Sequence, residues 1–222
     1  MKSVVRAIRT ALGWLGPRRR GRWILAGLDS NVEVLSDDHG VPHVFAHSQR
    51  DLFFVQGYLH ARERAFQMDL QRRIGQGRLS EVLGGAALPA DIFLRKLGLW
   101  QQALRLWPEL DREVQSWMIH YAHGVNVGLK RLAPVECWLL GHSIEPWTAL
   151  HSLLWTLVMA FDMGSNWESE WVRWKLLEKL GPDGARRFHL EHPEEFPSGC
   201  GSACGRAMDS LWSDYQRARG VL

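Results

Sequence analysis

The spacing of apolar residues along the chain predicts a mostly helical protein. In residues 111–130, apolar side chains recur every three or four positions and form one continuous stripe. Similar spacing predicts helices over 52–74, from 145–154 onward with Thr148 as the N-cap, and over 168–180. Gly181-Pro182 is the expected end of the last helix. A short helix or connector is expected over 88–99.

Residues 31–48 depart from this helical spacing. The segment "NVEVLSDDHGVPHVFAHS" alternates apolar and polar positions, is rich in β-branched residues and contains "DDHG" as a turn. Alternation on both sides of a turn predicts two short strands joined in a hairpin. Ser48, followed three residues later by Asp51, resembles a capping box and marks the start of the next helix.

The composition is typical of a globular domain, and the positive charge is concentrated at one end. The chain has 222 residues, of which 46% are apolar, which suffices for one substantial domain. Seven basic residues precede the first acidic residue, Asp29, and leave 20 basic and 24 acidic groups in the remainder. We therefore expect no nucleic-acid partner. The basic tail, residues 1–24, is either a solvated arm or a short amphipathic helix that contacts a membrane surface.

The sequence does not settle the compartment. The apolar stretch "ALGWLG" is short for a signal peptide and arginines follow it, so no convincing signal peptide is present. No stretch approaches the ~20 apolar residues of a membrane span. Cys137, Cys200 and Cys204 make an odd count, and the role of the last two is left open.

No complete catalytic set is evident from the residue pattern alone. The ten histidines include no H-E-x-x-H zinc motif, and the chain contains no G-x-S-x-G nucleophile elbow. The most specific candidate is "MGSNW" at 163–167, where Ser165 is followed by Asn as at the start of an N-terminal-nucleophile chain.

Longer phrases carry a family resemblance. The stretch "DDHGVPHVFAHSQRDLFFVQGYLHARERAFQMDLQRRIGQGRLSEVLGG" (37–85) resembles the opening of the penicillin acylase family of N-terminal-nucleophile hydrolases. This family includes penicillin, cephalosporin and acyl-homoserine lactone acylases. The phrases "ADIFLRKLGL", "YAHGVNVGL", "LLGHSIEPWTALHSL" and "GSNWESEWVRWKLLEKLG" follow in the family's order. The resemblance covers roughly residues 25–195.

The resemblance implies a hydrolase of linear amides, such as an antibiotic or a quorum-signal amide. Family members are zymogens, and autocatalytic processing divides them into two chains. The second, β chain carries the nucleophile, whose own α-amino group titrates near pH 8 and acts as the base. The first, α chain is largely helical and helps to wall the acyl pocket. The resemblance also implies a periplasmic location.

The present chain is therefore expected to be the α-chain portion of an αββα N-terminal-nucleophile hydrolase fold, mostly α with a short N-terminal β-hairpin. Its expected divisions are the tail (1–24), the acylase α-chain domain (25–195) and an irregular spacer (196–222) before the cleavage site. Its expected partners are the β chain, in a heterodimer, and a small-molecule acyl amide.

Ser165 is expected to be a helix-start or pocket-rim residue. Cleavage before it would leave 58 residues, which are too few for a two-sheet catalytic core. A helical pattern, "ESEWVRWKLLEKLG", also follows it where a nucleophile of this type would begin a strand. No catalytic residue is therefore expected on this chain, and the chain alone is predicted to be inactive.

The resemblance assigns substrate contacts to three residues and metal support to one. Met159, Phe161 and Met163 match the part of the α chain that lines the acyl pocket, and ordinary core packing is the alternative. Glu170 matches the glutamate that the α chain lends to a calcium site shared with the β chain. The alternative is a first-turn glutamate that the helix dipole stabilises. Glu168 lies about 200° around the same helix and is the competing ligand.

A function of a different class also remains open. The twelve tryptophans suit a noncatalytic, truncated helical remnant that binds a partner through a Trp-rich apolar face.

Overall fold

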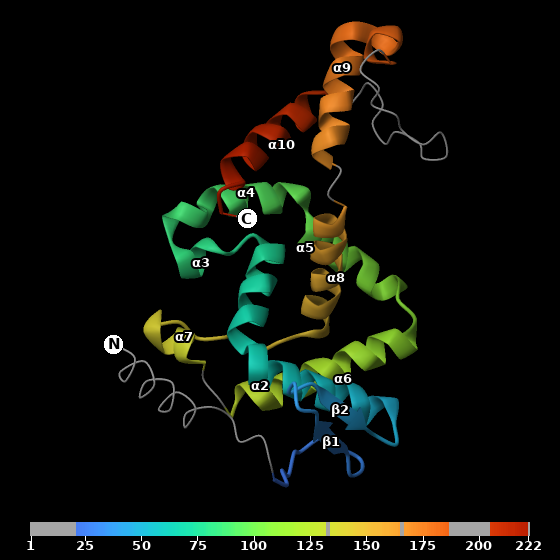
Figure 1. Cartoon of the computed structure of the whole chain (residues 1–222), viewed down its shortest axis with the longest axis vertical. Helices are drawn as coiled ribbons and strands as arrows, with labels where there is room; N and C mark the ends of the chain where they lie inside the picture. The colour runs from blue at the N-terminus through green and yellow to red at the C-terminus, as the bar shows by residue number, and fades with distance from the viewer. Residues whose placement is uncertain (1–20, 132–133, 165–166, 187–204, 222) are drawn as a thin grey trace. The chain divides into compact units, whose positions relative to one another are not determined.

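The described chain is mostly helical and carries one short hairpin near its start (Figure 1). The structure is a computed structural model that describes residues 21–131, 134–164, 167–186 and 205–221. Its elements are β1 (Glu33–Ser36), β2 (Pro42–Phe45), α2 (Gln49–Gln76), α3 (Ser80–Leu83), η1 (Gly85–Ala87), α4 (Leu88–Leu97), α5 (Leu99–Leu106), η2 (Trp107–Glu109), α6 (Arg112–Leu129), α7 (Val135–Leu139), α8 (Ala149–Met163), α9 (Trp167–Arg186) and α10 (Gly205–Ala218). In these described ranges, no helix is both long and apolar enough to cross a bilayer.

The chain folds into two compact units. The first comprises Met1–Leu70 with Trp107–Ser152, and the second comprises Gln71–Leu106 with Leu153–Leu222.

The predicted hairpin is present in the first unit, where β1 and β2 pair antiparallel. Asp37 fixes its turn, because the carboxylate accepts hydrogen bonds from the backbone N–H groups of His39 (2.9 Å) and Val41 (2.8 Å). Gly40, with φ of 81°, supplies the left-handed conformation that the turn needs. The alternation and the "DDHG" turn therefore predicted this element correctly.

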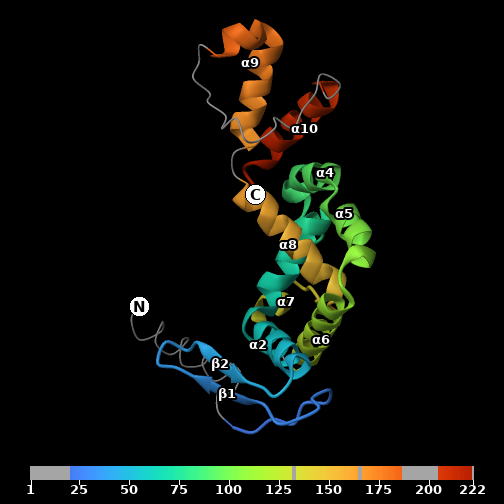
Figure 2. The same ribbon diagram turned by 90° about the vertical axis from the view of Figure 1, so that its right-hand side faces the viewer.

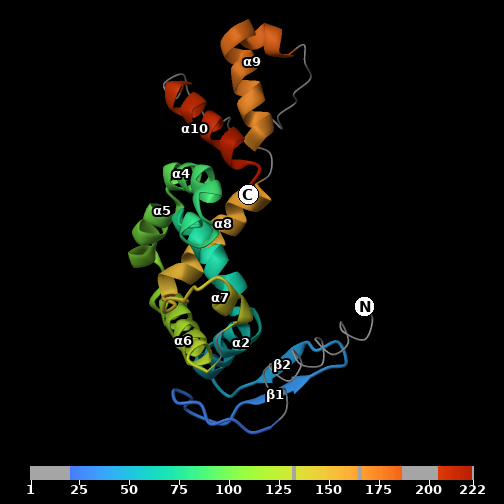
Figure 3. The same ribbon diagram turned by 90° about the vertical axis from the view of Figure 1, so that its left-hand side faces the viewer.

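One face of the hairpin covers the first half of α2 (Figure 3). Val34 and Val44 lie opposite each other and pack against a buried cluster on α2. That cluster consists of Phe54, Val55, Tyr58 and Leu59. On the next positions of the strands, Leu35 and Phe45 are more than half exposed. The hairpin therefore buries one apolar face and leaves apolar side chains on the other.

Glycines allow α2 and α6 to cross with their backbones nearly in contact. A Cβ atom on Gly124 would lie 1.8 Å from the carbonyl oxygen of Phe54, and one on Gly57 would lie 2.1 Å from that of Tyr121. Both distances are far below any van der Waals contact. Gly128 meets Ala61 in the same way, at 2.7 Å. The helix predicted over 111–130 is thus present, and its glycines form the crossing.

The buried face of α2 agrees only in part with the one that the apolar spacing predicts. Arg64 has non-helical backbone angles (φ −139°, ψ 21°), so a kink divides the helix. A single straight stripe assumes an unbroken helix, and the predicted one comprises Leu52, Val55, Leu59, Phe66, Leu70 and Ile74. In the structure Val55 and Leu59 are buried as predicted. Leu52 is exposed, the three residues after the kink are only half-buried, and Arg72 is buried.

In the second unit, α4, α8, α9 and α10 meet around Phe93 (Figure 2). Phe93 is fully buried, and its ring centroid lies 5.3 Å from that of Tyr215 on α10. Trp171 on α9 stacks on Trp212 of α10, with centroids 4.1 Å apart and planes 11° apart. Aromatic side chains from all four helices therefore contact one another in this core.

The expectation of an irregular segment over 196–222 is wrong for residues 205–218, which form α10. Residues 196–204 lie outside the described ranges. Apolar side chains of α10 lie at helical spacing and belong to the Phe93 cluster. They are Leu211, Tyr215 and Ala218. The helix at 168–180 is present within α9, and Gly181 interrupts it as expected, with φ of 68°.

Candidate functional site

The three residues predicted to line the acyl pocket lie at the end of α8. Met159 and Met163 are four residues apart and share one face of the helix, whereas Phe161 lies about 200° away from Met159. Met163 is 75% exposed. Phe161 is half-buried, and its ring lies 6.1 Å from that of Phe93 in the core cluster. The helix therefore separates the three residues, and only the two methionines can face one space together.

Glu170 lies in the first turn of α9 and is about one-third exposed. Its Oε1 accepts a hydrogen bond from Nη1 of Arg173 at 2.6 Å. Glu168 has a different environment, because its Oε1 accepts a hydrogen bond from the Tyr215 hydroxyl at 2.6 Å. This bond raises the pKa of Tyr215. The two glutamates thus have different neighbours, and the bond to Tyr215 ties Glu168 to α10.

A carboxylate oxygen is the ligand chemistry that calcium requires, and Glu170 can supply one such ligand. Among the described residues, no three His, Cys, Asp or Glu side chains come together as a metal site. Ser165 lies outside the described residues.

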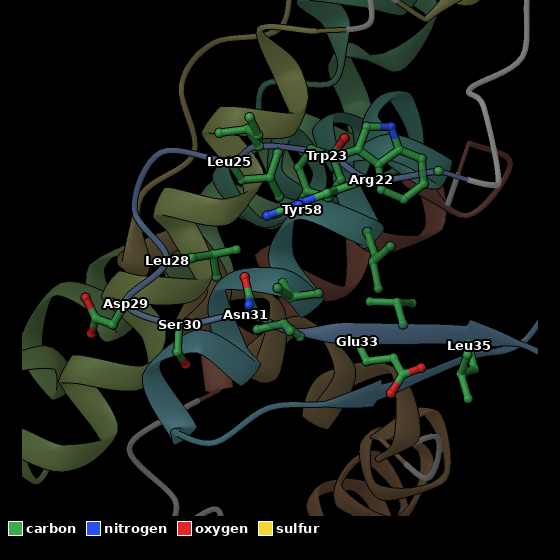
Figure 4. A pocket seen from close by; sticks show the side chains of 16 residues that line it. Arg22, Trp23, Leu25, Leu28, Asp29, Ser30, Asn31, Glu33, Leu35 and Tyr58 are labelled. Atoms are coloured by element: carbon green, nitrogen blue, oxygen red, sulfur yellow. The ribbon is translucent and has the colours of Figure 1, made fainter.

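The structure also has a hollow of about 940 Å³ in the first unit (Figure 4). It lies between the segment 21–35 and the first half of α2, which contributes Val55, Tyr58 and Leu59. Leu25 and Leu28 line it from the segment. Met159, Phe161, Met163 and Glu170 are not among its lining residues.

Asp51 holds the segment that forms one wall of this hollow. The fully buried carboxylate accepts hydrogen bonds from the backbone N–H of Asp29 (2.9 Å) and of Ser30 (3.2 Å) and from the Ser30 hydroxyl (3.0 Å). Burial opposes ionisation of Asp51, but these bonds outweigh it and lower the pKa of the carboxyl. The sequence indicated Asp51 only as a helix-start residue.

A second buried carboxylate, Asp91 on α4, was missed by sequence reasoning. It accepts hydrogen bonds from the backbone N–H of Leu79 (2.6 Å) and of Ser80 (2.8 Å), and from the Ser80 hydroxyl. Arg95, one turn further along α4, donates to the carbonyl of Gly77 at 2.8 Å. The signal available in the sequence was an acidic residue inside an apolar stretch, "PADIFL". Its role here is to hold the 77–80 loop.

Side-chain hydrogen bonds to the backbone also join other sequence phrases that carry the family resemblance. The side-chain amide of Asn126 donates to the carbonyl of Trp147 at 2.8 Å and accepts from its backbone N–H at 2.7 Å. The phrase "YAHGVNVGL" is thereby bound to "EPWTALHS", as "GRLSE" is bound to "ADIFLRK" through Asp91. The phrases that suggested a family therefore make contacts with one another within each unit.

Comparison with known proteins identifies the family. The sequence profile of the penicillin amidase family matches residues 31–204. The chain belongs to the penicillin amidase family. The resemblance inferred from the ordered phrases is confirmed.

Members of the penicillin amidase family with known activities are similar to most of the chain. The penicillin acylase 2 proenzyme of Pseudomonas sp. (strain SE83) is 36% identical over 193 residues, which are 86% of this chain and 25% of the proenzyme. An acyl-homoserine lactone acylase, QuiP of Pseudomonas syringae pv. tomato, is 32% identical over 178 residues, or 79% of this chain and 22% of that protein. The chain thus spans about a quarter of the length of these relatives.

A solved family member has a similar fold. A thermostable penicillin G acylase from Alcaligenes faecalis contains a chain that superposes with a TM-score of 0.59 at 28% identity. The superposition covers 78% of this chain and 97% of that chain. The fold of this chain is therefore similar to that of one chain of a penicillin G acylase.

Proposed function

We propose that this chain is the α chain of a two-chain amidohydrolase that cleaves an acyl amide. The observation that carries the proposal is the near-complete coverage, 97%, of a chain of a solved penicillin G acylase. The curated relatives are about four times longer than the matched region, which leaves room for a large catalytic chain. The αββα fold would be completed by that second chain.

The nucleophile and its α-amino base belong to the second chain in this proposal. Met163 ends α8 and Trp167 begins α9, and the helices described after Ser165 are the broken helix α9 and α10. These elements supply no sheet on which a nucleophile could be mounted. Ser165 is therefore proposed as a residue between two helices with no role in bond cleavage.

The α chain contributes to substrate binding through the end of α8. Met159 and Met163 share a face, and the second is largely exposed within its unit. Flexible, apolar thioether side chains suit an acyl group. Phe161 supports this end of the helix from the core side through Phe93. The acyl amide is proposed to be a β-lactam or an acyl-homoserine lactone, by analogy with the named relatives.

Glu170 is proposed to lend one carboxylate to a calcium ion whose other ligands come from the second chain. Its support is its place at the start of α9, its partial exposure and its oxygen chemistry. Bound calcium would hold the two chains together at this point. Arg173 orients the carboxylate of Glu170 through a hydrogen bond from its Nη1.

The test is expression of this chain together with the coding sequence that lies downstream of it in the same gene. The two-chain complex is expected to hydrolyse β-lactam amides or acyl-homoserine lactones, with release of the free acid as the measured product. A downstream sequence that encodes no acylase catalytic chain would favour the noncatalytic helical remnant. A complex that forms but hydrolyses neither class of amide would contradict the proposed activity.

A further inference from the structure

The hairpin of the first unit leaves the outer edge of β1 open. Within the described ranges, β1 pairs with β2 and the sheet has two strands. The backbone N–H of Asp37 donates to the carbonyl of Val41 at 3.1 Å, and Ser36 lies opposite Pro42 at the next position. Proline has no N–H group, so Ser36 and Pro42 form a non-hydrogen-bonded pair. These contacts fix which backbone groups of the hairpin face inward and which face outward.

The backbone groups of Val34 face the open edge. Hydrogen-bonded and non-hydrogen-bonded pairs alternate along an antiparallel ladder, so Val34 and Val44 are also a non-hydrogen-bonded pair. Their N–H and C=O groups therefore point to the outer edges of the two strands. On β2 this edge contains Pro42, which removes a donor and weakens pairing there. The outer edge of β1 contains no proline and can pair with a further strand.

The hollow of about 940 Å³ runs along this edge of β1 (Figure 4). β1 lines it through Val34, and the segment before β1 lines it through Trp23 and Leu25. From α2, the buried side chains of Val55 and Leu59 contribute to the lining. A chain lying in the hollow would therefore have a strand edge beside it and apolar side chains against it.

The segment that lines the hollow opposite β1 is held in place. Nη2 of Arg131 donates to the carbonyl of Ile24 at 2.7 Å. The guanidinium group of Arg62 lies 5.5 Å from the centre of the Trp23 ring. Asp51 binds the backbone of the turn that leads from this segment to β1. The hollow is therefore formed before anything enters it.

The hairpin carries apolar side chains on both faces. Val34 and Val44 pack on α2, whereas Leu35 and Phe45 are 52% and 57% exposed on the opposite face. An antiparallel pair at a protein surface usually alternates between an apolar buried face and a polar solvated face. Apolar residues on both faces are typical of strands inside a larger sheet.

From the open edge and the hollow beside it we infer that β1 accepts an extended strand of the second chain, which adds to the hairpin and continues its sheet. The inference rests on the proposed function, because the second chain is itself proposed. The added strand would exchange backbone hydrogen bonds with Val34. Every second side chain of that strand would meet Val55 and Leu59 and is expected to be apolar.

The competing occupant is β1 of a second copy of this chain. That strand already carries β2 on one edge and has the segment 21–30 beside the other. A second copy would have to bring this segment into the same hollow together with β1. A single strand of a different chain has no such attachment and fits the space between the two walls better.

Amide hydrogen exchange in the two-chain complex, resolved to single residues, tests the inference. The N–H of Val34 should exchange at least about tenfold more slowly than that of Val44, because the added strand protects only the edge of β1. Val44 is an internal control, since it lies opposite Val34 and also packs on α2. Local opening of the hairpin therefore affects both groups.

A pair of substitutions at Val34 tests the same hydrogen bond. Val34→Pro removes the outward N–H and leaves the bonds between β1 and β2 unchanged. The amount of this chain that co-purifies with a tagged second chain should fall about tenfold. Val34→Ala is the matched control, because it also loses side-chain contact with α2 but keeps the N–H, and it should co-purify in at least several-fold larger amount. Circular dichroism verifies the fold of each variant, and if Val34→Pro does not fold, hydrogen exchange decides.

The possible failures are distinguishable. Equal exchange at Val34 and Val44 in a complex that hydrolyses an acyl amide would overturn the inference and leave the proposed function intact. Equal co-purification of folded Val34→Pro and Val34→Ala would do the same. Slow exchange at Val34 in this chain without the second chain would assign the edge to a second copy. A downstream sequence that encodes no second chain would remove the proposed function and this inference together.

Discussion

Three glycines determine how closely α2 and α6 approach. Gly57 belongs to the phrase "VQGYLHARERAFQMD", and Gly124 and Gly128 belong to "YAHGVNVGL". In the structure these two phrases face each other at the crossing. The family resemblance in this region therefore has a simple physical basis, because a side chain at any of these positions would force the backbones apart.

Gly124→Ala is expected to destabilise the protein by about 1–3 kcal/mol or more, the usual range for overpacking a tight site. The added methyl group would lie 1.8 Å from the Phe54 carbonyl oxygen, which is backbone and cannot rotate away. Urea denaturation measures the change. Gly85→Ala is the control, because no atom lies within 4 Å of its added Cβ, and it should be nearly neutral. Equal stability of the two variants would contradict the crossing.

The proposed calcium site predicts different effects for substitutions of Glu170 and of Glu168. In the assembled enzyme, Glu170→Gln should lower calcium content and slow maturation or assembly, because one anionic ligand is lost. Glu168→Gln should leave the calcium content unchanged, since Glu168 lies about 200° around the helix from Glu170 and does not face the same ion. Atomic absorption on the purified complex measures the metal. Normal calcium content and processing in the Glu170 variant would remove this assignment.

Kinetics can distinguish two roles of Phe161, which either lines the acyl pocket or only packs in the core. If it shapes the acyl site, Phe161→Leu should change the preference among acyl chain lengths by about tenfold, as expected when an apolar pocket changes shape. The measurement is kcat/KM for a series of acyl amides in the two-chain enzyme. A uniform loss for every substrate would assign Phe161 to packing against Phe93 alone.

At the scale of elements, α10 is the part of the fold that the sequence indicated least. The run "SGCGSACG" before it is rich in small residues, which hid the helical spacing of Leu211, Tyr215 and Ala218. α6 and the hairpin were predictable because each carries its whole periodicity within one uninterrupted segment. The sequence did not predict fully which face of α2 is buried, since a kink at Arg64 divides the helix and has no local marker in the sequence.

The attachment of α10 to α4 should depend on pH. The carboxylate of Asp214 is 3% exposed and pairs with Lys96 and with Arg217. The hydrogen bond from Lys96 is the main cause of the lowered pKa of Asp214, which lies below its ordinary value of 3.8. A carboxyl with a lower pKa in the folded state stabilises the fold above its unfolded pKa. This contribution is lost as the pH falls below about 4 and through the folded pKa.

Asp214→Asn should therefore destabilise the protein by about 1–3 kcal/mol at neutral pH, as for other hydrogen bonds to charged groups. Thermal melting at neutral pH and below pH 4 measures the difference, which should shrink in acid. Asp209→Asn is a useful control because Asp209 is exposed and pairs with Lys175 on α9 instead. A Tm difference for Asp214→Asn that does not change with pH would exclude the ion pair as the cause.

At the scale of the whole molecule, the chain exposes several large apolar side chains that a monomeric protein usually buries. Leu35 and Phe45 lie on the outer face of the hairpin and Met163 at the end of α8, all more than half exposed. The site residues could be anticipated only by their order along the family sequence. Packing within this chain does not bear on their proposed roles, because the proposed calcium and acyl-group sites also draw on the proposed second chain.

The chain alone is therefore expected to hydrolyse neither β-lactam amides nor acyl-homoserine lactones. It should also self-associate, because exposed apolar patches of this extent lead to association. Light scattering coupled to size exclusion measures the second property, and product release measures the first. A monomer with one sharp thermal transition would count against the need for a partner chain, and hydrolysis by the isolated chain would refute the assignment of the nucleophile.

The stacked indoles of Trp171 and Trp212 also have an optical consequence. With centroids 4.1 Å apart, the two chromophores are close enough for their excited states to couple and for each to quench the other's emission. One indole belongs to α9 and the other to α10, so the coupling exists only while the two helices are together. The near-ultraviolet spectrum of the protein thus carries a built-in, label-free signal of whether α10 is packed against α9.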